Sequence, residues 1–209
     1  MDMKEVFREN KILAIMRNVP LEKTIDYAQA IVDGGVKCFE VALNSKDAYK
    51  QIAMLHQYFG ERALIGAGTA ITLEKAKKAL EAGAQFLLTP STHEDVLAYC
   101  EKEKILFLPG ALTPSEVATC LKYGFTTIKL FPAGDMKKGY IKSLKGPFDE
   151  TDYVAIGGVN VDNIHEFFEQ GYLAVGLGSN LMPKEIVLSN DWEKGKEYVA
   201  ALVSKINKL

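Results

Sequence analysis

Short apolar runs rich in β-branched and aromatic residues alternate along the chain with longer segments in which apolar residues recur every three or four positions. The first pattern is typical of buried strands and the second of amphipathic helices. The predicted strands are Ile12–Met16, Cys38–Leu43, Ala63–Ala67, Phe86–Thr89, Ile105–Leu108, Thr127–Phe131, Tyr153–Ile156 and Leu173–Leu177. The segments between them predict helices, for example over Leu21–Asp33, Leu73–Ala82, Pro114–Tyr123 and Asn163–Gln170.

Local signals mark where these helices begin and end. Glycines that suit the left-handed position after a helix precede several strands, at Gly35, Gly83, Gly124 and Gly171. A capping residue at Thr113, a proline at 114 and Glu116 three positions after the cap predict a helix start. Similar starts are predicted at Thr72 and at Ser91, the latter giving His93 a local structural role.

The regular alternation predicts an α/β protein with a parallel sheet. Eight strand–helix units in 209 residues favour a small (β/α)8 TIM barrel that forms a single domain over residues 1–209. We expect an N-terminal helix over Met3–Glu9 to cap the bottom of the barrel and Trp192–Lys208 to complete the outer ring. An open, doubly wound sheet is the structural alternative.

Composition then limits the class of function. Hydrophobic residues make up 48% of the chain and charged residues 25%, as in ordinary globular proteins. The 25 basic and 27 acidic residues nearly balance, which predicts no nucleic-acid or membrane partner. The beginning of the chain lacks the pattern of a signal peptide. Because the three cysteines form no CxxC pair, we expect a reduced, cytoplasmic protein.

Lys129 is the most informative polar residue, because it interrupts an otherwise apolar strand. Alternation places Thr127, Lys129 and Phe131 on one face, which points into the barrel if Ile128 and Leu130 pack under the helices. Burial disfavours an ammonium group, so it supplies the neutral amine that Schiff-base chemistry with a ketone needs. A lysine that reaches solvent or pairs with a carboxylate is the structural alternative.

Glu40 and Arg17 add to this pattern. The same packing argument turns Glu40 inward from its strand, where it is either a structural ion partner of the lysine or a general acid–base. Arg17 follows the first strand and offers a planar donor for a carboxylate or a phosphate. Each residue has a structural explanation, but three charged groups at one end of a barrel favour catalysis.

Glycine-containing pairs end the last two strands, at Gly157-Gly158 and Gly178-Ser179. Loops at these two places commonly form a phosphate site in such barrels. The sequence contains no convincing metal-ligand spacing, P-loop, dinucleotide-binding or GxSxG motif. It therefore predicts lysine chemistry without a metal.

Several of these segments together resemble those of one enzyme family. They are Ala14–Arg17, Glu40–Asn44, Gly66–Thr69, Pro109–Gly110, Lys129–Pro132, Gly157–Val159 and Gly178–Ser179. In this order, over nearly the whole chain, they resemble the 2-keto-3-deoxy-6-phosphogluconate (KDPG) aldolases. That family includes 4-hydroxy-2-oxoglutarate (KHG) aldolases and aldolases specific for the phosphogalactonate epimer (KDPGal).

The resemblance implies a class I aldolase, a homotrimer that works without a cofactor through a covalent imine on Lys129. Lys129 would form that imine with the C2 ketone, and Glu40 would take the C4 hydroxyl proton, through a water, and later protonate the enamine. Arg17 and Thr69 would hold the substrate carboxylate. The remaining implied roles are Pro90 lining the pocket, Phe131 beside the imine, and Gly157, Gly158, Gly178 and Ser179 binding the phosphate.

Two positions depart from the phosphogluconate pattern. Asn44 stands where many members carry arginine, and Ile156 stands where they tend to carry threonine. A threonine there can hydrogen-bond a substrate hydroxyl, whereas isoleucine cannot. The combination is closer to the galactonate-type aldolases, so either epimer is an expected substrate.

The expected function is cleavage of a phosphorylated 2-keto acid, KDPG or its galactonate epimer, to pyruvate and D-glyceraldehyde 3-phosphate. Cleavage of 4-hydroxy-2-oxoglutarate to pyruvate and glyoxylate is a further expectation. One alternative is a phosphosugar isomerase or decarboxylase with Glu40 as base and Lys129 as an electrostatic clamp. The other is a phosphosugar-binding module without catalysis.

Overall fold

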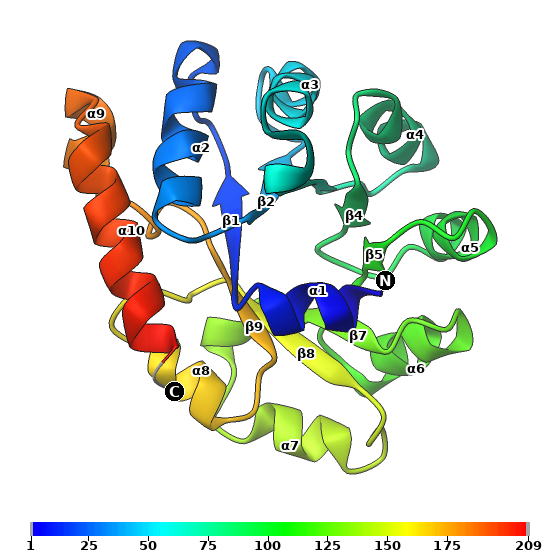
Figure 1. The fold of residues 1–209 in the computed structure, drawn as a ribbon. Coiled ribbons are helices and arrows are strands. Elements are labelled where there is room, and N and C mark those ends of the chain that lie inside the picture. Colours follow the sequence, from blue (N-terminus) through cyan, green and yellow to red (C-terminus); the bar gives the residue numbers. More distant parts are fainter. Residues whose placement is uncertain (1, 208–209) are drawn as a thin grey trace.

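This computed structural model describes residues 2–207. They form a barrel of parallel strands surrounded by helices (Figure 1). Its strands are β1 (Ile12–Met16), β2 (Cys38–Ala42), β3 (Leu64–Gly68), β4 (Phe86–Leu88), β5 (Phe107–Leu108), β6 (Gly110–Ala111), β7 (Thr127–Leu130), β8 (Asp152–Ile156) and β9 (Ala174–Leu177). Its α-helices are α1 (Met3–Glu9), α2 (Thr24–Asp33), α3 (Ala48–Phe59), α4 (Leu73–Glu81), α5 (Glu94–Lys102), α6 (Pro114–Lys122), α7 (Tyr140–Lys145), α8 (Ile164–Glu169), α9 (Lys184–Ser189) and α10 (Trp192–Ile206). Strands and helices alternate, so the predicted TIM barrel is confirmed.

The barrel closes just after the fifth predicted strand. The strand order is β5-β4-β3-β2-β1-β9-β8-β7-β6, and every neighbouring pair is parallel. The strand predicted over Ile105–Leu108 is present as the shorter β5, which pairs with β4, whereas β6, beyond Pro109, was not predicted and pairs with β7. Pro109 has no N–H group, and the Gly110 N–H donates to the side-chain oxygen of Thr89 at 3.2 Å, so the ladder is interrupted there.

Apolar side chains form two packed regions, one between the strands and the outer helices and one inside the barrel. The inner region joins strand side chains such as Leu13 and Phe86 to Val6 and Phe7 of α1. Figure 1 shows α1 lying across this end of the barrel. The predicted N-terminal helix over Met3–Glu9 is therefore confirmed, and it covers the end opposite to the carboxyl ends of the strands.

Most helix signals act as predicted. Thr113 forms a capping box with Glu116, and the Thr72 side chain accepts a hydrogen bond from the Lys75 N–H. The start predicted at Ser91 was wrong, because α5 begins at Glu94 after His93 without a side-chain cap. The Ser91 hydroxyl instead contacts the ring of His93 at 2.9 Å.

Two predicted helices differ from the structure at their ends. The segment predicted from Leu21 starts as a 3₁₀ turn over Leu21–Lys23 before α2 begins. The last helix ends at Ile206, and Lys208, where the prediction ended it, lies outside the described residues. The predicted helix-ending glycines are all left-handed, for example Gly35 with φ 101° and Gly83 with φ 99°.

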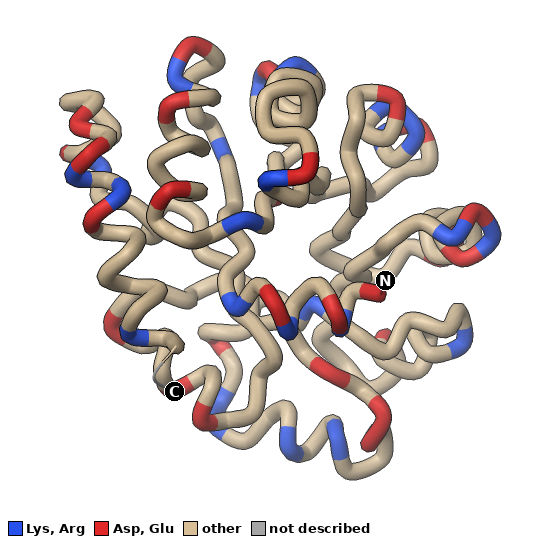
Figure 2. The backbone as a smooth tube through the Cα atoms, viewed as in Figure 1, with Lys and Arg blue, Asp and Glu red and all other residues tan. Residues whose placement is uncertain are grey.

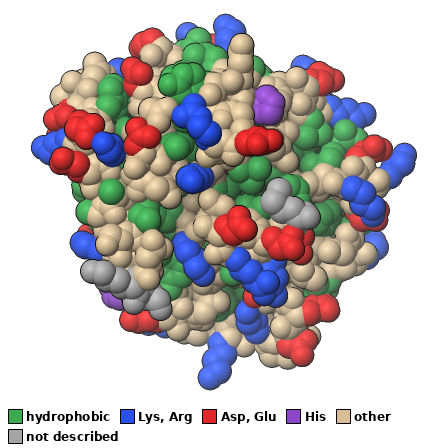
Figure 3. Space-filling view, in the orientation of Figure 1, with side chains coloured by type: hydrophobic (Ala, Val, Ile, Leu, Met, Phe, Trp, Pro, Cys, Tyr) green, Lys and Arg blue, Asp and Glu red, His purple; other side chains and the backbone are tan. Residues whose placement is uncertain are grey.

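Charged residues of both signs are spread over the outer helices and loops (Figure 2). On the face seen in Figure 3, acidic and basic groups are interspersed with apolar patches, so no field of a single sign extends over it. Within residues 2–207, no helix has the length and apolar character needed to cross a bilayer.

Candidate active site

Lys129 and Glu40 are both buried inside the barrel, with 5% and 1% of their surface exposed. Lys129 lies on β7 and Glu40 on β2, and alternation along each strand turns both side chains inward, as predicted. The Lys129 Nζ lies 5.3 Å from the centre of the Phe131 ring, which is exposed at the end of the same strand. An amine and a carboxylate therefore share the apolar interior of the barrel.

The surroundings of Lys129 favour its neutral form. Burial lowers the pKa of its amine, the negative charge of Glu40 opposes that shift, and the positive charge of Arg17 adds to it. The Oε2 atom of Glu40 is buried without a hydrogen-bond partner among the described residues. Because Lys129 and Glu40 form no ion pair within 4.0 Å in the described chain, neither group is neutralised by direct contact with the other.

A pocket of about 470 Å³ opens at the carboxyl ends of β1, β8 and β9. The predicted site residues that line it are Arg17, Phe131, Ile156, Gly157, Gly158, Gly178 and Ser179. Sequence reasoning missed the other lining residues, which are Ile15, Asn18, Val159, Gly176 and Asn180. All but Ile15 and Gly176 directly follow a predicted site residue, and those two lie on the inner faces of β1 and β9.

The two glycine loops offer backbone donors to this pocket. Gly157 and Gly158 have left-handed φ values of 88° and 75°, and Asn163 holds the Gly158 carbonyl through a hydrogen bond of 2.9 Å. The N–H groups of Gly158 and Ser179 donate to no other group in the described part of the chain. Free N–H groups beside an arginine are suited to an anion such as phosphate.

Five predicted site residues do not line the pocket: the buried Lys129 and Glu40, and three residues in loops at this end of the barrel, Thr69, Pro90 and Asn44. Thr69 follows β3 with a left-handed φ of 63°, and the partly buried Pro90 follows β4. Asn44 is exposed after β2. The hydroxyl of Ser45, next to Asn44, accepts a hydrogen bond of 3.1 Å from the backbone N–H of Asn18. This bond connects the loop after β2 to the loop after β1.

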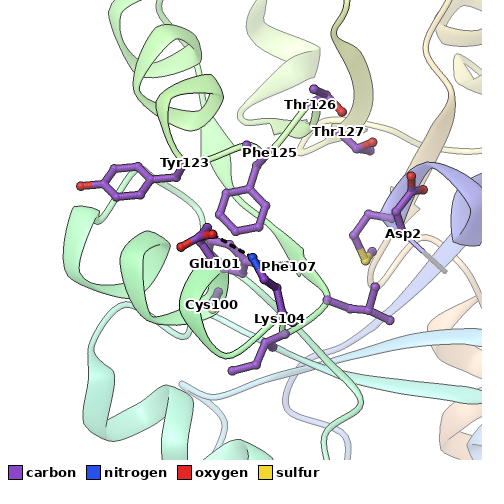
Figure 4. Close-up of a pocket in the computed structure, with 13 residues that line it drawn as sticks. Asp2, Cys100, Glu101, Lys104, Phe107, Tyr123, Phe125, Thr126 and Thr127 are labelled. Carbon is purple, nitrogen blue, oxygen red and sulfur yellow. Dashed lines mark hydrogen bonds and ion pairs between the residues drawn. The ribbon is translucent and has the colours of Figure 1, made fainter.

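A second pocket of about 400 Å³ lies at the opposite end, between the loops that precede β5 and β7 (Figure 4). Phe107 and Phe125 form an edge-to-face pair there, and the Lys104 amine contacts Glu101 at 2.8 Å. Its charged pair is satisfied locally, and none of the predicted site residues lines it. No group of three His, Cys, Asp or Glu side chains suited to a metal ion occurs within residues 2–207.

The fold and the pocket define a barrel with a buried amine, a buried carboxylate and a mouth that has free backbone N–H groups. The family model for KDPG and KHG aldolase matches residues 3–197. The chain therefore belongs to the KDPG/KHG aldolase family, whose members are aldehyde-lyases.

Individual relatives agree with this assignment. The chain is 31% identical over 172 residues to the 2-dehydro-3-deoxy-6-phosphogalactonate aldolase of Escherichia coli K12, covering 81% of this chain and 83% of that protein. It is 27% identical over 192 residues to the 2-dehydro-3-deoxy-phosphogluconate aldolase of Treponema pallidum, covering 91% and 90%. A solved KDPG aldolase from Legionella pneumophila, with pyruvate captured as a covalent carbinolamine, superposes with a TM-score of 0.90 at 28% identity and covers 97% of this chain and 98% of that one.

Proposed function

We propose that this protein cleaves 2-keto-3-deoxy-6-phosphogluconate or its galactonate epimer to pyruvate and D-glyceraldehyde 3-phosphate, through a Schiff base on Lys129. The observation that carries the proposal is the buried Lys129, whose pKa is lowered by burial, together with the buried Glu40 in one barrel interior. The two relatives described above are named for these two phosphorylated substrates.

Lys129 begins the reaction as a neutral amine. Its nitrogen adds to the C2 ketone to give a carbinolamine. One proton from solvent is taken up as this adduct loses water, which leaves a protonated imine. The positive charge of the imine makes C2 an electron sink, so no cofactor is needed for the bond cleavage. Phe131, whose ring centre is 5.3 Å from the amine, packs beside the imine.

Glu40 then handles the protons. Its carboxylate takes the C4 hydroxyl proton, directly or through a water, as that oxygen becomes the aldehyde oxygen and the C3–C4 bond breaks. The electron pair of that bond moves to C3 and the imine, which gives an enamine. After the aldehyde leaves, the protonated Glu40 returns its proton to C3, and water releases pyruvate and the free Lys129 amine.

The substrate carries two negatively charged groups, a phosphate and a carboxylate, and different residues bind each of them. The phosphate fits the N–H groups of Gly158 and Ser179, with Gly157 and Gly178 allowing the close approach of the backbone. Arg17 and Thr69 hold the carboxylate, and Pro90 and Asn44 complete the surrounding loops. A substrate without a phosphate, such as 4-hydroxy-2-oxoglutarate, would be cleaved by the same chemistry with weaker binding.

Ile156 is the residue that we expect to set the preference at C4. Its side chain is buried inside the barrel and also lines the pocket. An aliphatic group cannot hydrogen-bond the hydroxyl that a threonine would orient. This supports the galactonate epimer, or both epimers, as the substrate.

The wider setting is proposed on the same basis. We expect a homotrimer that acts in the cytoplasm in an Entner–Doudoroff type of sugar-acid breakdown. All three cysteines are buried free thiols, as expected in a reducing compartment. Light scattering on the purified protein measures the mass of the assembly, and a mass other than that of three chains contradicts the trimer.

Borohydride trapping tests the Schiff base directly. Incubation with pyruvate and borohydride is expected to add one reduced pyruvate to Lys129, located by peptide mass spectrometry. Lys129→Ala is expected to show no adduct, and equal trapping in that variant would contradict the mechanism. Activity that depends on an added metal, lost with a chelator, would instead favour the isomerase or decarboxylase alternative, whereas binding without turnover would favour a phosphosugar-binding module.

A further inference from the structure

Two glycines of β3 face the barrel interior beside Glu40. In the parallel register of β2 and β3, Glu40 lies opposite Gly66, and Ala42 lies opposite Gly68. Gly68 is therefore one layer nearer to the carboxyl ends of the strands than the residue that Glu40 directly opposes. The Glu40 side chain must lean along the strand to lie above one of these two glycines.

The space above Gly66 is already filled from the other side. A Cβ atom built on Gly66 would lie 2.5 Å from Cε2 of Phe86 and closer still to two other atoms of that ring. Phe86 belongs to β4 and lies opposite Gly66 in the register of β3 and β4. Because the buried Phe86 ring occupies this layer, the carboxylate of Glu40 is excluded from it.

The space above Gly68 is filled by Glu40 itself. A Cβ atom built on Gly68 would lie 2.6 Å from Cγ of Glu40, with Cδ and Oε1 closer still. The φ angle of Gly68 is outside the left-handed region, so the backbone does not require glycine there. Glycine is needed at position 68 because it has no side chain, and Glu40 occupies the space that a side chain would fill.

We propose that Gly68 is a positioning residue for the general acid–base of the reaction, a role that rests on the proposed function. Phe86 blocks the lower layer and Gly68 leaves the upper layer open, so the Glu40 side chain extends toward the open end of the barrel. With Oε2 lacking a hydrogen-bond partner in the described chain, packing against Gly68 fixes the carboxylate there. A methyl group at position 68 displaces the carboxylate and leaves Lys129 in place.

The first test is a double-mutant cycle in activity. Gly68→Ala is expected to lower kcat for aldol cleavage about 100-fold, the cost of moving a catalytic group by about 1 Å. It is also expected to slow the exchange of pyruvate methyl protons for deuterium, which NMR follows, because Glu40 protonates the enamine carbon. In the Glu40→Gln background, Gly68→Ala is expected to cause no further loss, because the group that it displaces is already inactive.

The second test is a cycle in stability, which covers the case that the single variant folds poorly. Gly68→Ala is expected to lower the Tm of the wild-type protein and to lower it equally in the Glu40→Gln background, since glutamine fills the same volume. In the Glu40→Asp background the loss is expected to be much smaller, because the shorter side chain vacates the space that the methyl group needs.

The outcomes separate this inference from the proposed function. A Gly68→Ala variant with wild-type kcat overturns the inference. So does a loss of activity on adding Gly68→Ala to Glu40→Gln that is as large as the loss in the wild-type background. An equal loss of Tm in the Glu40→Asp background also overturns it. Failure of the wild-type protein to trap pyruvate on Lys129 overturns the proposed function, whereas the stability cycle reports on the packing in either case.

Discussion

The two ends of this barrel are built from opposite kinds of residue. At the closed end, large apolar side chains of α1, among them the fully buried Phe7, fill the space between the strands. At the open end, glycines and the ends of the strands leave space, and the carboxyl group of Glu40 and the amine of Lys129 are buried just beneath it. The closed end therefore contributes stability, whereas the open end gives up packing to hold the groups that do the chemistry.

This difference predicts that mutations at the closed end mainly change stability, whereas mutations at the open end change both stability and activity. Cavities at the closed end lower the free energy of unfolding because buried apolar contacts are lost. Removal of the two titratable side chains at the open end raises it, because burying a carboxylate, or holding an amine neutral, in an apolar interior costs free energy. Activity is expected to follow only the open end.

The largest effect on stability is expected at the closed end. Phe7→Ala removes a fully buried ring from the interior and is expected to lower the free energy of unfolding by about 3–5 kcal/mol. Urea denaturation measures the loss. The kcat of the folded protein is expected to stay at the wild-type value, and a large fall in kcat at a temperature where the variant is folded would contradict the separation of the two ends.

Charge removal at the open end is expected to have the opposite sign. The double variant Lys129→Met with Glu40→Gln is expected to be inactive but about 1–4 kcal/mol more stable at pH 7. The lowered pKa of Lys129 means that the unfolded chain binds an extra proton between that pKa and the ordinary lysine value, so wild-type stability rises with pH there.

The double variant Lys129→Met with Glu40→Gln lacks this rise of stability with pH. The amount by which it is more stable than the wild type is therefore expected to shrink as the pH approaches 10.5, the ordinary lysine pKa. Urea denaturation at pH 7 and at pH 10 measures this change. An advantage that grows between these two pH values would contradict a lowered pKa of Lys129.

Arg17 offers a test within the open end. Its positive charge helps to lower the pKa of the Lys129 amine, so Arg17→Ala is expected to raise that pKa and move the acidic limb of the pH profile of kcat/KM to higher pH. At pH 7, kcat/KM is expected to fall about 10- to 100-fold, since a charged hydrogen bond contributes about 1.5–3 kcal/mol. Arg17→Lys keeps the charge, and it is expected to restore the pH profile more fully than the affinity.

Ile156 is expected to show a smaller effect, confined to selectivity. Ile156→Thr is expected to shift the ratio of kcat/KM for the gluconate and galactonate phosphates by about three- to tenfold toward the gluconate epimer, since one neutral hydrogen bond contributes about 0.5–1.5 kcal/mol. Parallel kinetics on both epimers measure this ratio. An unchanged ratio would remove Ile156 from the determinants of C4 preference.

The smallest effect is expected in the pocket at the closed end. Lys104 is mostly exposed and, among residues 2–207, pairs only with Glu101, so Lys104→Ala is expected to change stability by no more than the roughly 0–1 kcal/mol that exposed pairs contribute. The kinetic constants are expected to equal those of the wild type. A marked change in kcat would show that this second pocket communicates with the open end.

The sequence predicted those parts of the molecule that depend on local patterns. Strand alternation was sufficient to turn Glu40 and Lys129 inward, and the cap at Thr113 was visible in three residues. The interruption at Pro109 was not predicted, because it depends on the side chain of Thr89, which directly follows β4. The Ser91 prediction failed for a related reason, since that hydroxyl contacts His93 in place of the helix backbone.

The sequence also predicted some parts of the candidate site and not others. Residues at strand ends were found because the barrel places all of those ends on one side. The fit of Glu40 above Gly68 was not found, because it requires the register between two strands and the position of Phe86 on a third. Which residues line the pocket also depends on loop conformation, and Thr69 and Asn44, which the sequence predicted for the site, do not line it.

The interruption at Pro109 also affects how folded copies of the chain meet one another. The strand that it divides pairs with β4 on one side and β7 on the other, and the Pro109 carbonyl accepts a 2.8 Å hydrogen bond from the Lys129 N–H. The described sheet therefore has no exposed edge that could recruit a strand from a neighbouring molecule. Aggregation through strand addition must begin from chains in which the barrel has opened, so the resistance of a preparation to fibre formation depends on the integrity of this closure.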